Sequence, residues 1–385
     1  MPPRSAYIVL FLGLLAGPPS PAMAQSAADP GIDDDRIGAG PADPDREGSD
    51  DGDQKDGKRP NLGGTLRAGV EYDTNAFRGL TESDRIAGLG RYFLTLDGEF
   101  EPYQDSALEL RLQQGGKWYP AAGSADALLT SLDARWRQRL GETFGVRVQT
   151  HFKDRLERTS RQDYSRGGLR TAVSADFGDV STSLGAGWRY FAFRPNPSSS
   201  SHGPHLTASV GVQVADPVRV RGSYDLSRRI FDSVRFVLDP SADVVERDTT
   251  GRERRDWLHV LRLGGTYRGP LILEAAYVLL MNRSNSYGQG LVRHGAEVDV
   301  TAPLPWRLYL SGRLRLQWTQ YEDPIFVGAD FRVDEENRNA LTLSLARAIG
   351  DHWEVEARYR LFIEEFGATG DYRRQTAFVG GAYLF

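Results

Sequence analysis

The sequence predicts an all-β fold, an up-and-down transmembrane β-barrel of about sixteen antiparallel strands. Three observations predict it. From Asn61 onward, segments of about ten residues alternate apolar and polar side chains, and a period of two is strand geometry. Short turns and longer polar loops alternate between these segments. The chain then ends on a further alternating segment that closes with Phe385.

The alternation is clear over residues 307–321, where leucines and Trp318 occupy one parity and arginines occupy the other. Strict two-residue alternation excludes an amphipathic helix for such windows. Sixteen segments of this kind are centred near Ala68, Leu96, Leu112, Leu132, Val148, Val173, Leu184, Val210, Val220, Leu261, Ala275, Val298, Leu310, Leu343, Ala357 and Val379.

The connections between the segments are of two kinds. Short turns are expected at residues 102–106, 141–143, 177–179, 215–217, 268–270, 302–305 and 349–351. Longer loops are expected at 74–85, 120–126, 159–168, 195–203, 230–256, 283–289, 322–336 and 367–370. Membrane barrels have this asymmetry, with short periplasmic turns and longer outer loops. An even number of strands then places both chain ends in the periplasm.

The seven tryptophans favour a barrel in lipid over a soluble sandwich, in which indole rings would favour strand middles. All seven are expected on the apolar parity near strand ends, where they form two membrane-interface belts. Trp306 and Trp318, placed on one strand, would be separated by about 30 Å, one bilayer. The membrane-interface residues are Trp118, Trp136, Trp188, Trp257, Trp306, Trp318 and Trp353.

The polar parity is rich in arginine and must face the barrel interior, because an arginine at the bilayer midplane costs about 2–4 kcal/mol. We expect the pore to be lined by Arg135, Arg137, Arg139, Arg219, Arg221, Arg313, Arg315, Arg358 and Arg360. Two interpretations remain open. Pairs of arginine and carboxylate across strands can stiffen the inner wall, or the guanidinium groups can serve a conduit for anionic or hydroxyl-rich solutes.

The N-terminal part differs from the barrel segments. Residues 1–24 predict a signal peptide, with an apolar core and the small-residue cleavage site Ala22-Met23-Ala24. Residues 25–60 carry a net charge of −6 and no aromatic side chain, which predicts a disordered acidic periplasmic leader. Residues 61–385 form the predicted barrel.

The chemistry expected of an enzyme or of a nucleic-acid-binding protein is missing from the sequence. The chain has no cysteine, and its six histidines are scattered, so we expect no metal site, no cofactor and no catalytic residue. An outer-membrane enzyme acting on envelope lipid remains an alternative. No phosphate-binding loop follows a strand, and we expect no nucleic acid as a partner.

The last stretch, DYRRQTAFVGGAYLF, with Tyr383 and the terminal Phe385, resembles the assembly signal of Gram-negative outer-membrane barrels. This resemblance implies location in the cell outer membrane, contact with outer-membrane lipid, and insertion by the barrel assembly machinery. The first segment ends in Tyr72-Asp73-Thr74-Asn75, which is similar to the opening strand of barrels from exopolysaccharide secretion loci of the myxobacterial type.

The second resemblance implies export of a polysaccharide together with a periplasmic polymer-export protein. We therefore expect a conduit for polysaccharide across the outer membrane. The alternative is a general small-solute porin with a weak preference for anions.

Overall fold

The computed structural model describes residues 61–75, 87–121, 123–158, 163–239, 244–323, 339–363 and 373–385. The predicted signal peptide and acidic leader lie outside these residues. Among the described residues, no helix is long and apolar enough to cross a membrane.

Eighteen strands make up the described structure, and sixteen of them form one closed barrel. The sixteen are β1 (Asn61–Asp73), β2 (Ala87–Phe100), β3 (Ser106–Trp118), β4 (Ala127–Leu140), β5 (Phe144–Glu157), β6 (Tyr164–Phe177), β7 (Val180–Phe193), β8 (Ser201–Ala215), β9 (Val218–Val234), β12 (Glu253–Arg268), β13 (Ile272–Ser284), β14 (Leu291–Leu304), β15 (Leu308–Tyr321), β16 (Asn339–Ile349), β17 (Trp353–Ile363) and β18 (Arg373–Leu384).

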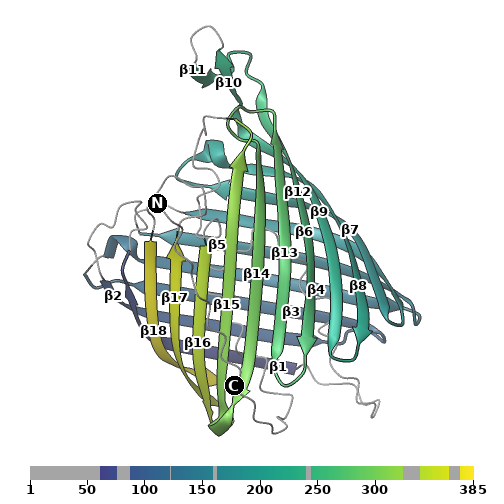
Figure 1. Cartoon of the computed structure of the whole chain (residues 1–385), viewed down its shortest axis with the longest axis vertical. Coiled ribbons are helices and arrows are strands. Elements are labelled where there is room, and N and C mark those ends of the chain that lie inside the picture. The colour runs from purple at the N-terminus through teal and green to yellow at the C-terminus, as the bar shows by residue number, and fades with distance from the viewer. Residues whose placement is uncertain are drawn as a thin grey trace, which may run out of the picture.

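Each strand pairs antiparallel with its neighbours along the chain, and β1 pairs with β18 to close the barrel. This confirms the predicted fold class, the strand number and the up-and-down order. The connections alternate in length as predicted, so we call the two ends of the barrel the short-turn end and the long-loop end. The C-terminus lies at the short-turn end (Figure 1).

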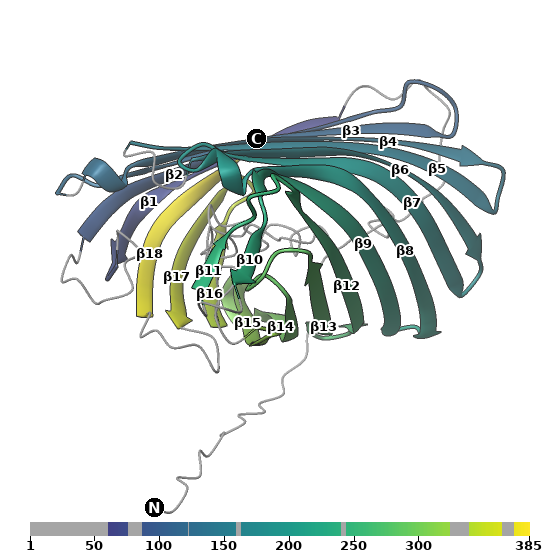
Figure 2. The same cartoon turned by 90° about the horizontal axis from the view of Figure 1, so that it is seen from above.

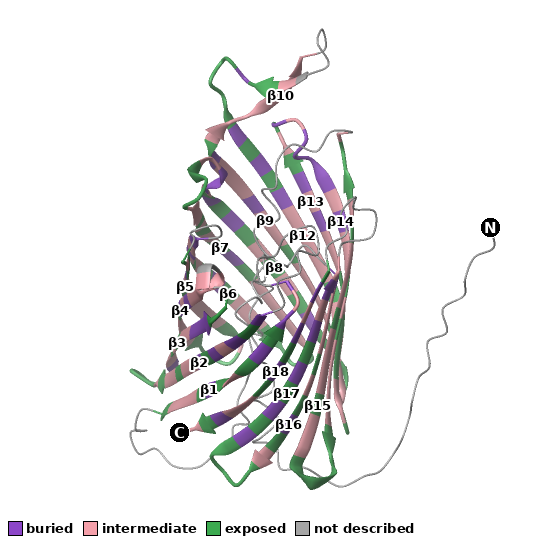
Figure 3. Cartoon of the chain, turned by 90° about the vertical axis from the view of Figure 1, so that its left-hand side faces the viewer, coloured by how far each residue is buried: buried purple, intermediate pink, exposed green. Residues whose placement is uncertain are grey.

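The two faces of each barrel strand differ in exposure, which Figure 3 shows as alternating bands. On β17, Trp353, Val355 and Tyr359 are exposed, whereas Glu354, Glu356, Arg358 and Arg360 are buried. The polar parity is the inner one, because its side chains meet across an intervening strand. Such contacts form where side chains converge on the concave face. Examples are Arg189 of β7 with Asp225 of β9 at 2.8 Å, and Arg67 of β1 with Glu356 of β17 at 3.3 Å.

Seen from above, the barrel is flattened (Figure 2). Strands β3–β7 form one long wall, and β12–β18 curve around the opposite side. The remaining two strands, β10 (Phe236–Asp239) and β11 (Val244–Arg247), form a hairpin in the connection between β9 and β12. This hairpin projects beyond the long-loop end instead of folding into the barrel (Figure 1).

Candidate functional site

The inner face of β4–β7 forms a basic wall, defined by nine inward-facing cationic residues and three acidic ones. Strand register places these side chains on the same parity as Arg189. The cationic residues are Arg135, Arg137, Arg139, Arg147, Lys153, Arg155, Arg166, Arg170 and Arg189. The acidic residues are Asp133, Glu157 and Asp176. A surface with this excess of guanidinium groups favours anions, which arginine binds through paired hydrogen bonds.

Seven of the nine arginines predicted to line the pore lie where the inner wall is open. Arg135 and Arg137 of β4 both contact Glu109 of β3, and their side chains are 19% and 30% exposed. Arg139 is the penultimate residue of the same strand and is exposed. These pairs leave part of each guanidinium group facing the lumen.

The other open arginines lie on β9 and β15. Arg219 donates a hydrogen bond to Ser181 Oγ at 2.8 Å, and Arg221 is half-buried beside it on the inner parity. Arg313 pairs with Asp299, and Arg315 pairs with Glu297 at 3.5 Å. The two arginines of β15 are therefore balanced by carboxylates of β14, whereas Arg219 of β9 contacts a hydroxyl group.

Arg358 and Arg360 differ from the other seven, because they are only 6% and 8% exposed. They belong to a buried ionic wall, which we define as the buried, inward charged residues of β1, β2, β3, β17 and β18. Its members are Arg67, Glu71, Asp73, Arg91, Lys117, Glu354, Glu356, Arg358, Arg360 and Arg374. Arg358 donates two hydrogen bonds to Glu356 and lies 5.2 Å from the Phe378 ring. For these two arginines, the first of the two interpretations applies: they interact with carboxylates and stiffen the inner wall.

The Tyr-Asp-Thr-Asn segment occupies the long-loop end of the seam between β1 and β18. Asp73 accepts two hydrogen bonds from Arg374, at 2.9 and 2.6 Å, although 301 residues separate them. The Tyr119 hydroxyl donates to the second carboxylate oxygen at 3.0 Å, and the Asn75 N–H donates to the first. Thr74 hydrogen-bonds to the backbone of Gln375. The motif therefore clamps the first strand to the last.

Sequence alternation did not indicate the aromatic side chains that face inward near the long-loop end of β6, β7 and β9. Tyr164, Phe191 and Phe193 lie on the inner parity. The ring centroids of Tyr164 and Phe191 are 5.7 Å apart, and those of Phe191 and Phe193 are 6.3 Å apart. Phe231 of β9 lies under the Arg254 guanidinium at 3.9 Å. The signal was present in Tyr190-Phe191-Ala192-Phe193, where aromatic residues occupy both parities of one strand.

Six of the seven tryptophans lie on the outward parity of their strands, toward one end or the other. Trp118, Trp188, Trp257 and Trp318 lie toward the long-loop end, and Trp136 and Trp353 lie toward the short-turn end. Trp306 differs from the expectation that it shares a strand with Trp318. It lies in the turn Pro305–Arg307, where Trp306 has φ +62° and is 79% exposed. β14 continues through Leu304, so the turn falls later than the prolines suggested.

The two residues predicted as the assembly signal lie at the short-turn end of the seam. Tyr383 faces outward and packs against Trp353, with a centroid distance of 4.9 Å. Phe385 exchanges two backbone hydrogen bonds with Gly64 of β1. Its ring lies so close to Gly64 that a Cβ there would come within 2.5 Å of it. The terminal aromatic residue therefore packs on the first strand.

Two histidines, His151 and His205, both face the lumen near Arg170 and Arg189, and the others lie elsewhere on the barrel. His259 and His294 face outward and hydrogen-bond to Tyr224 and Tyr277 at 2.8 and 2.6 Å. His205 is buried on the inner face, and His352 donates to the Leu384 carbonyl at the short-turn end. Within the described residues, no group of three or more acidic or histidine side chains is arranged to hold a metal ion.

No protein-family model matches the chain, and no curated protein matches it. Solved structures do resemble it. A loop-deletion mutant of the Vibrio cholerae outer membrane protein OmpT matches over 86% of this chain and all of its own, at 9% identity and a TM-score of 0.47. Salmonella typhi OmpF matches over 86% of this chain and 98% of its own, at 14% identity and a TM-score of 0.46. A bacterial polysaccharide outer membrane secretin matches over 84% of this chain and 97% of its own, at 13% identity and a TM-score of 0.42.

Proposed function

We propose that the protein is an outer-membrane β-barrel that conducts an acidic polysaccharide out of the cell, working with a periplasmic export partner. One observation carries the proposal, the basic wall of β4–β7 inside a closed sixteen-strand barrel. Sixteen strands leave room for an aqueous channel. An excess of partly exposed guanidinium groups along one wall favours a polymer that carries carboxylates and hydroxyls.

Placement in a bilayer is supported by the outward face. Leu184, Val210, Leu263 and Leu343 are exposed there, and aromatic residues stand toward both ends of the strands. Exposed leucines in this number would be unfavourable in water, whereas hydrocarbon accepts them. Bacterial barrels of this kind reside in the outer membrane, with short turns toward the periplasm.

The inward aromatic residues support a saccharide as cargo. Phe191 and Phe193 lie on the inner parity beside the basic wall and are partly exposed. Apolar ring faces can pack on the C–H faces of sugar rings, while arginine binds carboxylates and hydroxyls. A lumen built only for small inorganic anions has no need of these rings.

A porin for small anions is the second candidate, and the hairpin β10–β11 favours it. This part of the longest described connection stands clear of the barrel instead of constricting it. An enzyme acting on lipid has less support. The two inward histidines, His151 and His205, stand among arginines in the lumen. His259 and His294 hydrogen-bond to tyrosines on the outward face, and His352 lies at the short-turn end.

The test is block of ionic current through the purified barrel in a planar bilayer. We expect an oligogalacturonate to block the current more strongly than a neutral glucose oligomer of equal length. The double variant R135Q/R137Q should weaken the block by about tenfold, because two charge-assisted contacts are lost. R347Q is the control, because Arg347 faces outward opposite Leu308 and Val355, and it should leave the block unchanged.

The candidates give different outcomes in this experiment. A steady anion-selective current that neither oligomer blocks would favour the small-solute porin. Equal block by the charged and neutral oligomers would contradict the role assigned to the basic wall. A barrel that is closed until a periplasmic fraction is added would support a partnered exporter.

A further inference from the structure

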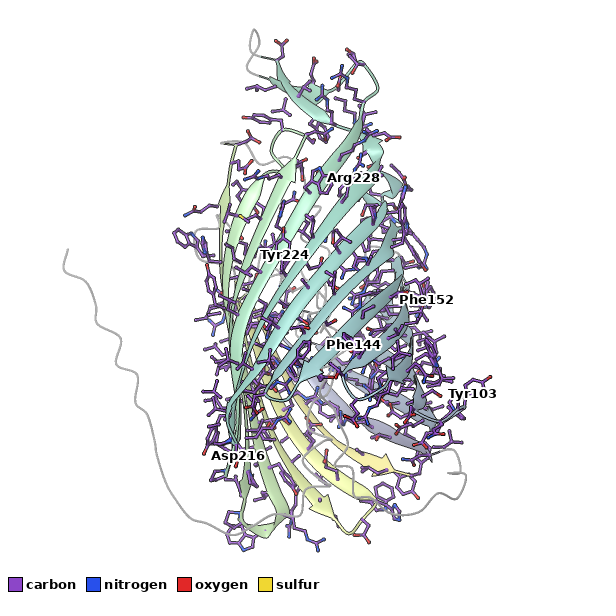
Figure 4. The ribbon with its side chains drawn as sticks, turned by 90° about the vertical axis from the view of Figure 1, so that its right-hand side faces the viewer. Tyr103, Phe144, Phe152, Asp216, Tyr224 and Arg228 are labelled. Atoms are coloured by element: carbon purple, nitrogen blue, oxygen red, sulfur yellow. The ribbon has the colours of Figure 1, made fainter. Side chains whose placement is uncertain are left out.

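The outward face carries two arginines that directly flank a belt tryptophan. Arg228 of β9 and Arg283 of β13 both pair in register with Trp257 of β12. Their neighbours Ser227, Asn282 and Leu258 are buried on the inner face, so the two arginines point outward. Figure 4 shows Arg228 and Tyr224 on the outside of the barrel.

The two arginines lie at the depth of the long-loop interface. Trp257 is close to the start of β12, and Arg283 is the penultimate residue of β13, at the same end as Trp318 of β15. Two interstrand spacings separate Arg228 from Arg283, or roughly 10 Å between Cα atoms. Both guanidinium groups can therefore reach one headgroup at the membrane surface.

Within the described part of the chain, neither arginine of this pair has the carboxylate partner that other outward arginines have. Arg255, two residues from Trp257, contacts Glu253 at 3.4 Å, and Arg194 of the β7 end contacts Asp154. Arg228 instead lies 5.7 Å above the Trp257 ring, and its Nε is buried without a hydrogen-bond acceptor. Arg283 has no ion pair among the described residues.

The local backbone brings β8 close to β9 at Arg228. Gly203 and Pro204 are not paired with β9, although the register is the same at His202 and His205 on either side, and Pro204 lacks an N–H. Gly203 adopts φ +157°, and a Cβ at this position would meet the Arg228 carbonyl oxygen at 1.9 Å. A glycine is required there, and the close approach fixes the backbone from which Arg228 extends.

We propose that Arg228 and Arg283 bind the phosphate-bearing headgroup of a lipid in the leaflet at the long-loop end. Guanidinium groups bind phosphate through paired, charge-assisted hydrogen bonds. A cation at the edge of hydrocarbon is costly unless an anion accompanies it, and the residues that the structure describes supply none to this pair. The proposal rests on the membrane placement in the proposed function.

The experiment measures lipid retention by native mass spectrometry of the folded, delipidated barrel. The probes are bis-phosphorylated lipid A and the same lipid with both phosphates removed. We expect the phosphorylated lipid to be retained, and the double variant R228Q/R283Q to lower its retention by about tenfold. The matched control is R347Q, because Arg347 faces outward at the short-turn end, opposite Leu308 and Val355.

Four results would overturn the proposal. The double variant could retain as much phosphorylated lipid as the wild type, or R347Q could lose as much as the double variant. Displacement of the lipid by millimolar inorganic phosphate would indicate a site for a free anion. A dimer that the double variant abolishes, with lipid retention unchanged, would assign the surface to a second copy of the chain. Folding in bilayers is scored separately by heat-modifiable migration, and failure there would overturn the proposed conduit as well.

Discussion

Asp73 connects the two ends of the barrel sequence through one buried carboxylate. Its bidentate pair with Arg374, together with the Tyr119 hydroxyl, satisfies the charge and the hydrogen-bonding capacity of both oxygens. Neither Asp73 nor Arg374 is exposed to solvent. Removing one partner of such a pair leaves the other charge buried and uncompensated. This costs more free energy than the intact pair contributes to stability.

We predict that D73N lowers the free energy of unfolding by about 3–5 kcal/mol, because it removes the buried charge that accepts two hydrogen bonds from Arg374. Urea titration in detergent micelles, followed by heat-modifiable migration, measures the loss. The control is D97N, which removes an inner-wall pair with Arg111 whose side chains are 47% and 43% exposed. It should cost less than about 1 kcal/mol. Equal losses in the two variants would contradict the clamp at the seam.

Exposure separates arginines that the sequence pattern treats alike. Arg137 and Arg358 both occupy the inner parity, but the side chain of Arg137 is 30% exposed and that of Arg358 only 4%. The first can meet a solute in the lumen, whereas the second holds Glu356 and covers Phe378. A shared face therefore does not imply a shared role.

At the scale of elements, the hairpin β10–β11 is held by its own polar contacts. Asp248 accepts hydrogen bonds from the Thr250 hydroxyl and backbone N–H, at 2.7 and 2.8 Å, and from Arg235 at 2.6 Å. These bonds favour the carboxylate and lower the pKa of Asp248 to about 2, from an ordinary value of 3.8. The hairpin is further joined to the β13–β14 connection by the backbone of Phe236.

We predict that the base of the hairpin loosens on acidification. Because the folded-state pKa is depressed, the stabilising contribution is complete above pH 4, decreases below it and is lost as pH falls through about 2. A spin label at the exposed Glu246 should become more mobile from pH 5 to pH 2. The variant D248N should give the mobile spectrum already at pH 7. An unchanged spectrum in D248N would show that Asp248 does not hold the hairpin.

The terminal strand has a separate consequence for assembly. Phe385 packs on Gly64, and its backbone completes the ladder between the last strand and the first. We predict that F385A lowers the amount of barrel in the outer membrane several-fold, measured by fractionation and immunoblotting. F177A is the control, because Phe177 is exposed at another strand end near a short turn. Equal reductions would assign the effect to lost apolar surface and not to the C-terminal signal.

At the scale of the whole molecule, the proposed membrane location requires the outward face to match a bilayer. Tryptophans stand toward both ends of the strands, where indole rings favour the headgroup region. The hydrocarbon core between the two belts is about 30 Å thick. Trp306, in a turn at the short-turn end, lies beyond the strand and not on it.

We predict that variants with one tryptophan, Trp318 or Trp353, are quenched most by lipids brominated near the headgroup. A variant with a tryptophan in place of Leu314 should be quenched most by lipids brominated near the chain ends, because Leu314 lies mid-strand on the outward face. Fluorescence in reconstituted vesicles measures the depth. Quenching that does not depend on bromine depth would contradict the position of the belts.

The sequence by itself determined the fold class, the strand number, the alternation of short and long connections, and the strand face on which the arginines lie. Each of these depends on a local rule, because alternation along a strand fixes which face a side chain joins, and chain length fixes the connections. The position of Trp306 was wrong, since the strand β14 ran through Pro303 to Leu304 and moved the turn.

Only the tertiary structure decided which inward arginines remain open and which are buried. That difference depends on closure of the barrel, which places β17, β18, β1 and β2 side by side and joins residues 301 positions apart. It also decided that Arg228 and Arg283 flank Trp257, because the register between strands, and not the pattern within one, sets such neighbours. Contacts between strands are non-local, and a period of two carries no information about them.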